Sequence, residues 1–138
     1  MRIIVDASVL VASLMENGTV RDVLLSSSDH QFFAPTYVRD EVVRNQGRIA
    51  SRARLSIETV RALTEDAFEA IELLPPPTYA HLLSEATALA KAADALGDEE
   101  YIAMALLLEA PVWTLDKDFR RVKGIDCLNT QEVNDLPP

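Results

Sequence analysis

Short apolar runs alternate along this chain with longer segments in which apolar residues recur every three or four positions. A short apolar run between polar or turn residues is typical of a buried strand, and the longer spacing is typical of an amphipathic helix. The apolar runs predict strands at residues 2–6, 31–34, 71–74 and 112–115, with a short fifth strand at residues 125–128.

Helices are predicted between these strands, and four of them begin at residue types that cap helix N-termini. These capping residues are Ser8, Thr19, Ser56 and Thr78. The predicted helices cover residues 8–16, 19–25, 36–49, 78–93, 98–109 and 117–122, and one more begins at residue 56. Turns are expected after the first two helices, at residues 17–18 and 26–28.

The alternation of strands and helices favours a mostly parallel sheet with helices on both faces. We therefore predict an α/β fold, a three-layer α/β/α sandwich around a sheet of four or five strands. Residues 1–133 are expected to form one domain, and residues 134–138 a frayed tail. In such sheets, ligands bind beyond the carboxyl ends of the strands, where the strand order reverses.

Composition and charge narrow the class of protein further. No apolar run among the 138 residues approaches the roughly 20 that a membrane span needs. The N-terminal segment does not resemble a signal peptide, and the single cysteine excludes an internal disulfide, so a cytoplasmic protein is expected. The net charge of −9, from 13 basic and 22 acidic residues, argues against a basic field that would hold nucleic acid by itself.

Four acids stand where an α/β sheet presents a ligand. Asp6 ends the first apolar run, Asp116 ends the fourth, Asp98 begins the helix before that strand, and Glu41 lies in the helix after the second strand. If the first and fourth strands are neighbours, the carboxylates of Asp6 and Asp116 converge. A cluster of carboxylates without histidine suits Mg²⁺ or Mn²⁺, which prefer oxygen ligands.

Each of these acids also has a simpler interpretation. Asp6, Asp98 and Asp116 are the residue type that caps or begins a helix, where a negative charge is favourable. Glu41 can be an exposed charge beside Asp40. The combination indicates a metal site more strongly than any single acid does, because two of the four end strands.

The motifs around these acids resemble those of the PIN domain, in particular the small VapC toxins and their stand-alone prokaryotic relatives. The resemblance covers essentially the whole chain. Its motifs are Ile4-Val5-Asp6-Ala7-Ser8-Val9-Leu10, Asp40-Glu41-Val42, Gly97-Asp98-Glu99-Glu100-Tyr101-Ile102-Ala103-Met104-Ala105 and Trp113-Thr114-Leu115-Asp116-Lys117-Asp118-Phe119.

The resemblance assigns roles to these residues. The metal-binding and catalytic acids of the family correspond to Asp6, Glu41, Asp98 and Asp116, and supporting residues to Ser8, Thr114 and Asp118. Asp40 and Glu99 are alternatives one position away. Glu41 is preferred because it stands six residues after Pro35, and Asp98 because it stands three before Tyr101.

The activity that the resemblance implies is Mg²⁺- or Mn²⁺-dependent hydrolysis of RNA by a metal-activated water, without a covalent intermediate. It also implies a homodimer and, for a toxin, an antitoxin protein that holds it inactive. The alternative is a PIN-like module that binds RNA or protein without cleaving. A phosphatase also places aspartates at strand ends, but Asp6-Ala7-Ser8 lacks the second aspartate of a D-x-D nucleophile motif.

Two groups of basic residues flank the acids in sequence. Arg44, Arg48 and Arg52 recur every four positions, which predicts one helical face. Lys117, Arg120 and Arg121 follow Asp116. Both groups are candidates for binding RNA phosphates, and both are also compatible with a solvated surface that carries local ion pairs.

Overall fold

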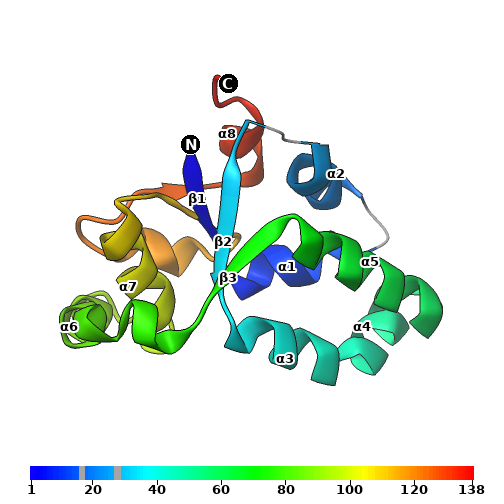
Figure 1. Cartoon of the computed structure of the whole chain (residues 1–138), viewed down its shortest axis with the longest axis horizontal. Coiled ribbons are helices and arrows are strands. Elements are labelled where there is room, and N and C mark those ends of the chain that lie inside the picture. Colours follow the sequence, from blue (N-terminus) through cyan, green and yellow to red (C-terminus); the bar gives the residue numbers. More distant parts are fainter. Residues whose placement is uncertain (16–17, 27–28) are drawn as a thin grey trace.

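The structure of this chain is a computed structural model that describes residues 1–15, 18–26 and 29–138. Within these residues, five strands form one sheet in the order β3-β2-β1-β4-β5, and every neighbouring pair is parallel (Figure 1). The strands are β1 (Arg2–Val5), β2 (Gln31–Pro35), β3 (Ile71–Leu74), β4 (Val112–Trp113) and β5 (Cys127–Leu128). The prediction of a mostly parallel sheet in an α/β/α sandwich is confirmed.

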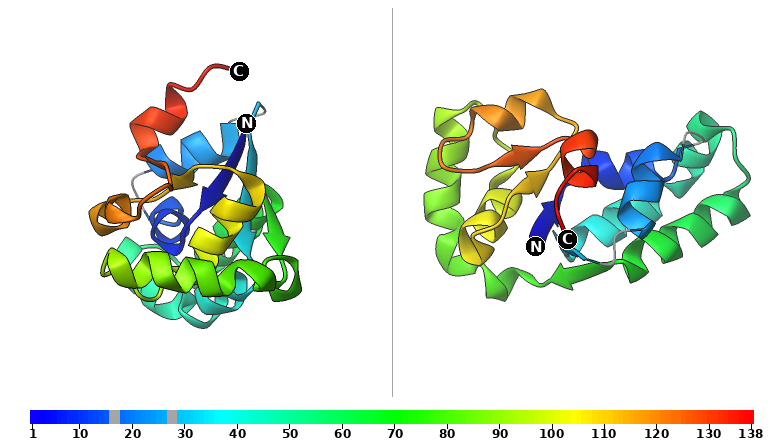
Figure 2. Two further views of the ribbon diagram at one scale, coloured as in Figure 1. Left: turned by 90° about the vertical axis from the view of Figure 1, so that its left-hand side faces the viewer. Right: turned by 90° about the horizontal axis from the view of Figure 1, so that it is seen from above.

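Helices cover both faces of this sheet, as the view from above in Figure 2 shows. One layer contains α6 (Leu83–Ala92) and α7 (Glu99–Leu108). The other contains α1 (Ala7–Ser13), α2 (Thr19–Ser26), α3 (Tyr37–Arg44), α4 (Gln46–Ala53), α5 (Ile57–Glu69) and α8 (Thr130–Asn134).

Alternate residues of each central strand enter the two opposite cores. In β1, Ile3 and Val5 pack with the layer of α1 to α5, whereas Ile4 packs with α6 and α7. All three side chains are fully buried, which explains why β1 reads as an unbroken apolar run. The residue that follows β1 is therefore delivered to the carboxyl edge of the sheet between two packed layers.

The helix predicted over residues 36–49 is wrong, because the structure divides it at Asn45. The Asn45 side chain donates a 2.7 Å hydrogen bond to the backbone oxygen of Glu41, one turn earlier in α3. Asparagine competes in this way with the backbone donor that would continue a helix. As a result Arg44 ends α3, whereas Arg48 and Arg52 belong to α4, so the three arginines do not share one helix.

The helix predicted from Thr78 is also wrong at its start. Residues 76–82 form two short 3₁₀ turns, η1 (Pro76–Thr78) and η2 (Ala80–Leu82), and α6 begins only at Leu83. The prolines before Thr78 lack backbone donors. Tyr79 is fully buried with its hydroxyl bonded to Glu100 at 2.9 Å, which holds this segment against α7.

Smaller differences concern other element ends. The structure ends α1 at Ser13, three residues before the expected end, and β4 is two residues shorter than predicted. The expected turn residues Asn17, Ser27 and Ser28 lie outside the described residues. Helix α8 was not predicted; it begins at a capping box between Asn129 and Glu132. None of the described helices has the length and apolar character that crossing a membrane requires.

Candidate active site

The acids gather at the point where the strand order reverses. The chain passes from β1 to β2 and β3 on one side, then returns to β4 and β5 on the other side of β1. Val5 pairs with Trp113, and the backbone nitrogen of Asp6 donates to the oxygen of Trp113 at 3.2 Å. Asp6 and Thr114 therefore emerge side by side, as expected for a ligand site in an open α/β sheet.

Asp6 is a buried carboxylate that is surrounded by donors. It is 5% exposed, and its Oδ1 accepts hydrogen bonds from the backbone nitrogens of Ser8 at 2.8 Å and Val9 at 3.4 Å. The Ser8 hydroxyl also donates to Oδ1, and the Thr114 hydroxyl donates to Oδ2. Asp6 thus caps α1 and is also a member of the acid cluster, which we define as Asp6, Glu41, Asp98 and Asp116. The hydrogen-bond donors around Asp6 offset the cost of burying its charge.

Ser8 and Thr114 also hold the loop that follows β4. The Ser8 hydroxyl oxygen accepts from the nitrogen of Leu115 at 3.1 Å, and that of Thr114 accepts from the nitrogen of Asp116 at 3.0 Å. Each hydroxyl therefore donates to Asp6 and accepts from the loop. The two residues predicted to support the site connect Asp6 to the backbone around Asp116.

Asp116 caps the 3₁₀ helix η3 (Lys117–Arg121) by accepting from the nitrogen of Asp118 at 2.9 Å. Its side chain is exposed. Asp118 is also exposed, and its carboxylate accepts from Arg121 at 2.6 Å. Asp118 is therefore engaged in an ion pair on η3, while its backbone orients Asp116.

Asp98 is placed differently from Asp6. No described residue donates a hydrogen bond to its side chain, although it directly precedes α7. Burial, together with the charges of Asp6, Asp116 and Glu99, raises the pKa of Asp98 to about 6. The neighbouring Glu99 turns back, and both its carboxylate oxygens accept from the nitrogen of Gly97 at 3.0 Å.

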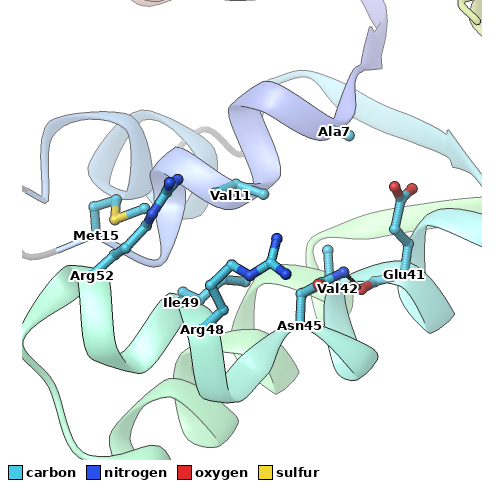
Figure 3. Close-up of a pocket in the computed structure, with 9 residues that line it drawn as sticks. All are labelled: Ala7, Val11, Met15, Glu41, Val42, Asn45, Arg48, Ile49 and Arg52. Atoms are coloured by element: carbon cyan, nitrogen blue, oxygen red, sulfur yellow. Dashed lines mark hydrogen bonds between the residues drawn. The ribbon is translucent and has the colours of Figure 1, made fainter.

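Glu41 lies on α3, and its carboxylate points toward the start of α1 at Ala7 (Figure 3). It lines a groove of about 220 Å³ whose lining does not include Asp40. The charges of Glu41 and Asp98 both contribute, after burial and the charge of Glu100, to raising the pKa of Tyr37. The ring of Tyr37 on α3 meets that of Tyr101 on α7, so the helices that carry Glu41 and follow Asp98 pack together.

The donors in this region are the type that a hard cation binds, since all four acids offer carboxylate oxygens. Among the described residues, however, no group of three or more His, Cys, Asp or Glu side chains is arranged to hold a metal ion. Mg²⁺ usually keeps several water ligands and takes only one or two carboxylates directly. The donor chemistry therefore fits Mg²⁺ or Mn²⁺, although the structure does not present a closed set of protein ligands.

A group of tyrosines behind the acids was not identified from the sequence. The rings of Tyr37 and Tyr101 meet edge to face with centroids 6.3 Å apart. Burial and the hydrogen bond to Glu100 raise the pKa of Tyr79. The sequence indicated Tyr101, three residues after Asp98, but did not place Tyr37 or Tyr79. Packing between α3, η2 and α7 brings these rings together.

The predicted basic residues fall in three different settings. Arg48 and Arg52 line the groove that contains Glu41. Arg44 and Lys117 are exposed and are not among its lining residues. Arg120 and Arg121 form ion pairs with Glu132 and Asp118.

Comparisons with known proteins agree with this fold. No curated protein matches the chain. A crystal structure of VapBC2 from Rickettsia felis, bound to a DNA fragment from their promoter, matches with a TM-score of 0.70 at 12% identity; the match covers 94% of this chain and 98% of that chain. The family profile described as PIN domain matches residues 4–136. The chain therefore belongs to the PIN domain family.

Proposed function

We propose that this protein is a Mg²⁺- or Mn²⁺-dependent endoribonuclease that hydrolyses phosphodiester bonds. One observation carries the proposal. Ser8 and Thr114 connect the carboxylate of Asp6 to the backbone around Asp116 at the β1/β4 edge, and the charges of both acids contribute to raising the pKa of Asp98. Carboxylates that repel one another in this way favour a divalent cation between them. PIN domain membership supports a nuclease.

In this proposal, Asp6, Glu41, Asp98 and Asp116 hold the metal. Bound there, the metal would activate water and stabilise the leaving oxygen of the phosphodiester. Ser8 and Thr114 keep the carboxylate of Asp6 in one orientation through their hydroxyls. The backbone of Asp118 does the same for Asp116.

A toxin role is a further part of the proposal. The similar Rickettsia felis chain comes from a structure of VapBC2, which supports an antitoxin partner for this chain as well. The VapC-like sequence motifs also support a homodimer, and the single cysteine supports a cytoplasmic location.

The second candidate is a PIN-like module that binds RNA or a protein without cleaving it. The observation in its favour is that no described group of three acids is arranged to hold a metal ion. The two candidates differ in one measurable property, the metal-dependent cleavage of RNA.

Cleavage of a diverse RNA pool with and without Mn²⁺ tests the proposal. We expect cleavage only with the metal, and a loss of roughly 100-fold or more in Asp98→Asn, since residues that merely support metal ligands are worth about 10- to 100-fold. Asp66→Asn, the same change at an exposed position of α5, is the control and should cleave normally. Equal cleavage by the Asp98→Asn variant and the wild type would contradict the proposal.

A further inference from the structure

The two groups of basic residues differ in how far their charge is already neutralised. Arg120 donates to Glu132 at 2.8 Å, and Arg121 donates to Asp118 at 2.6 Å. Both arginines therefore have an acid partner within the chain. Exposed pairs of this kind contribute little to stability, but a phosphate must compete with the carboxylate for each guanidinium.

Arg48 and Arg52 have no such partner in the part of the chain that the structure describes. No described residue forms an ion pair or a hydrogen bond with either side chain. They stand four positions apart on α4, one above the other and about 6 Å apart along the helix axis. Figure 3 shows that both side chains extend from α4 toward α1.

These arginines line one groove between α1 and the pair α3–α4. Its volume is about 220 Å³, and apolar side chains make up much of its lining: Val11, Met15, Val42 and Ile49. Glu41 and Ala7 also line it, and Ala7 directly follows Asp6. The groove therefore includes Glu41, one of the four acids, at its lining, whereas Arg120 and Arg121 do not line it.

We propose that this groove carries the RNA strand away from the acid cluster, with Arg48 and Arg52 on its phosphates, and that Arg120 and Arg121 do not hold substrate. The proposal rests on the ribonuclease function and adds the path of the substrate. Guanidinium groups bind phosphate oxygens through paired hydrogen bonds. The net charge of the chain is −9, so the two arginines that face the groove provide a local positive region where a polyanion can bind.

Binding of a labelled, unstructured RNA of mixed sequence tests this path by fluorescence anisotropy in the Asp98→Asn background with Mg²⁺. For single strands, each phosphate contact contributes about 0.7 to the slope of log affinity against log salt. The double variant Arg48→Ala/Arg52→Ala should lower that slope by about 1.4, and the affinity at 0.1 M salt roughly 25-fold.

Two variants with the same change in charge serve as controls. Arg120→Ala/Arg121→Ala should bind within about twofold of the background. Because that variant leaves two acids unpaired, Arg61→Ala/Lys91→Ala, at exposed positions of α5 and α6, supplies a second control. Thermal unfolding of each variant checks that the fold is retained.

A change in the groove lining gives a separate test. Val11→Glu places a carboxylate in the groove and should weaken RNA binding, whereas Val43→Glu, at an exposed position of α3 outside the groove, should not. If both Arg48→Ala/Arg52→Ala and Val11→Glu still bind RNA normally, the proposed substrate path is wrong, but the ribonuclease function is not contradicted. A protein segment would then be the better occupant of the groove. If the unmodified chain binds no RNA at all, the substrate path and the ribonuclease function both fail.

Discussion

The carboxylates of Asp6 and Asp98 belong to one cluster but differ in burial and in hydrogen bonding. Asp6 is the more buried, yet backbone and hydroxyl donors surround it. Asp98 is less buried, receives no hydrogen bond from a described residue, and faces the charges of Asp6 and Asp116. The sequence indicated both positions. It did not indicate this difference, because donors and charges reach each side chain from segments that are distant along the chain.

The pKa of Asp98 leads to a prediction about stability. This pKa rises from 3.8 to about 6 on folding, so ionisation of the carboxyl disfavours the folded state. The penalty is absent below about pH 4, grows between pH 4 and 6, and is complete above pH 6. Without divalent metal, Asp98→Asn should therefore raise the free energy of unfolding at pH 7.5 by on the order of 1 kcal/mol, after discounting for solvent screening of this half-exposed group.

Urea unfolding at pH 4 and pH 7.5 measures this effect. The gain from Asp98→Asn should be much smaller at pH 4 than at pH 7.5, and Asp66→Asn should show no comparable difference. An equal gain at both pH values would mean that the carboxyl of Asp98 is not the source.

At the scale of elements, the ends of β1 and β4 are joined by side chains rather than by a longer ladder. The predicted strand 112–115 is only two residues long, and Thr114 uses its hydroxyl to bond Asp6 and to accept from Asp116. Apolar periodicity predicted the strand because Val112 and Trp113 are buried. It does not predict where the ladder stops, since that depends on hydrogen bonds to another strand.

Thr114→Val should therefore damage the site more than the fold. The change keeps the shape of the side chain but removes a hydrogen bond to a buried carboxylate, which should lower the free energy of unfolding by about 1.5–3 kcal/mol. RNA cleavage should fall roughly 10- to 100-fold, because Asp6 loses one of the groups that orient it.

Thr64→Val is the matched control for this variant. Thr64 is equally buried, but its hydroxyl bonds the backbone oxygen of Val60 at 2.7 Å within α5, away from the acids. Denaturant unfolding and cleavage rates measured on both variants separate the two effects. Equal cleavage by the two variants would show that Thr114 does not position Asp6.

At the scale of the whole molecule, two separate apolar cores enclose the sheet and leave the acids at its carboxyl edge. The fold brings residues that are 108 positions apart, Asp6 and Thr114, into direct contact. It also brings the negative charges of Asp6 and Asp116 near Asp98, whereas these charges are far apart in an unfolded chain. A divalent cation that binds only the folded state should relieve this repulsion and stabilise the whole molecule.

Mn²⁺ should therefore raise the unfolding temperature of the wild type. A ligand at 100 times its dissociation constant adds about 2.7 kcal/mol to the free energy of unfolding. Scanning calorimetry across a Mn²⁺ titration measures the shift, which should be much smaller in Asp98→Asn and unchanged in Asp66→Asn. A wild type that shows no shift, or an equal shift in Asp98→Asn, would contradict metal binding by this cluster.

The sequence by itself determined the fold class and the positions of the strands, because buried strands require apolar runs wherever they lie in the fold. It also indicated the four acids, since two of them end such runs and the motifs around all four are local. The tertiary structure alone decided that Asn45 divides the third helix, that the tyrosines gather behind the acids, and that Arg48 and Arg52 face a groove while Arg120 and Arg121 meet acids. The tyrosine group and the groove depend on contacts between distant segments, and the bonds of Asn45 and Arg121 depend on the conformations of single side chains. Periodicity and spacing along one chain report neither.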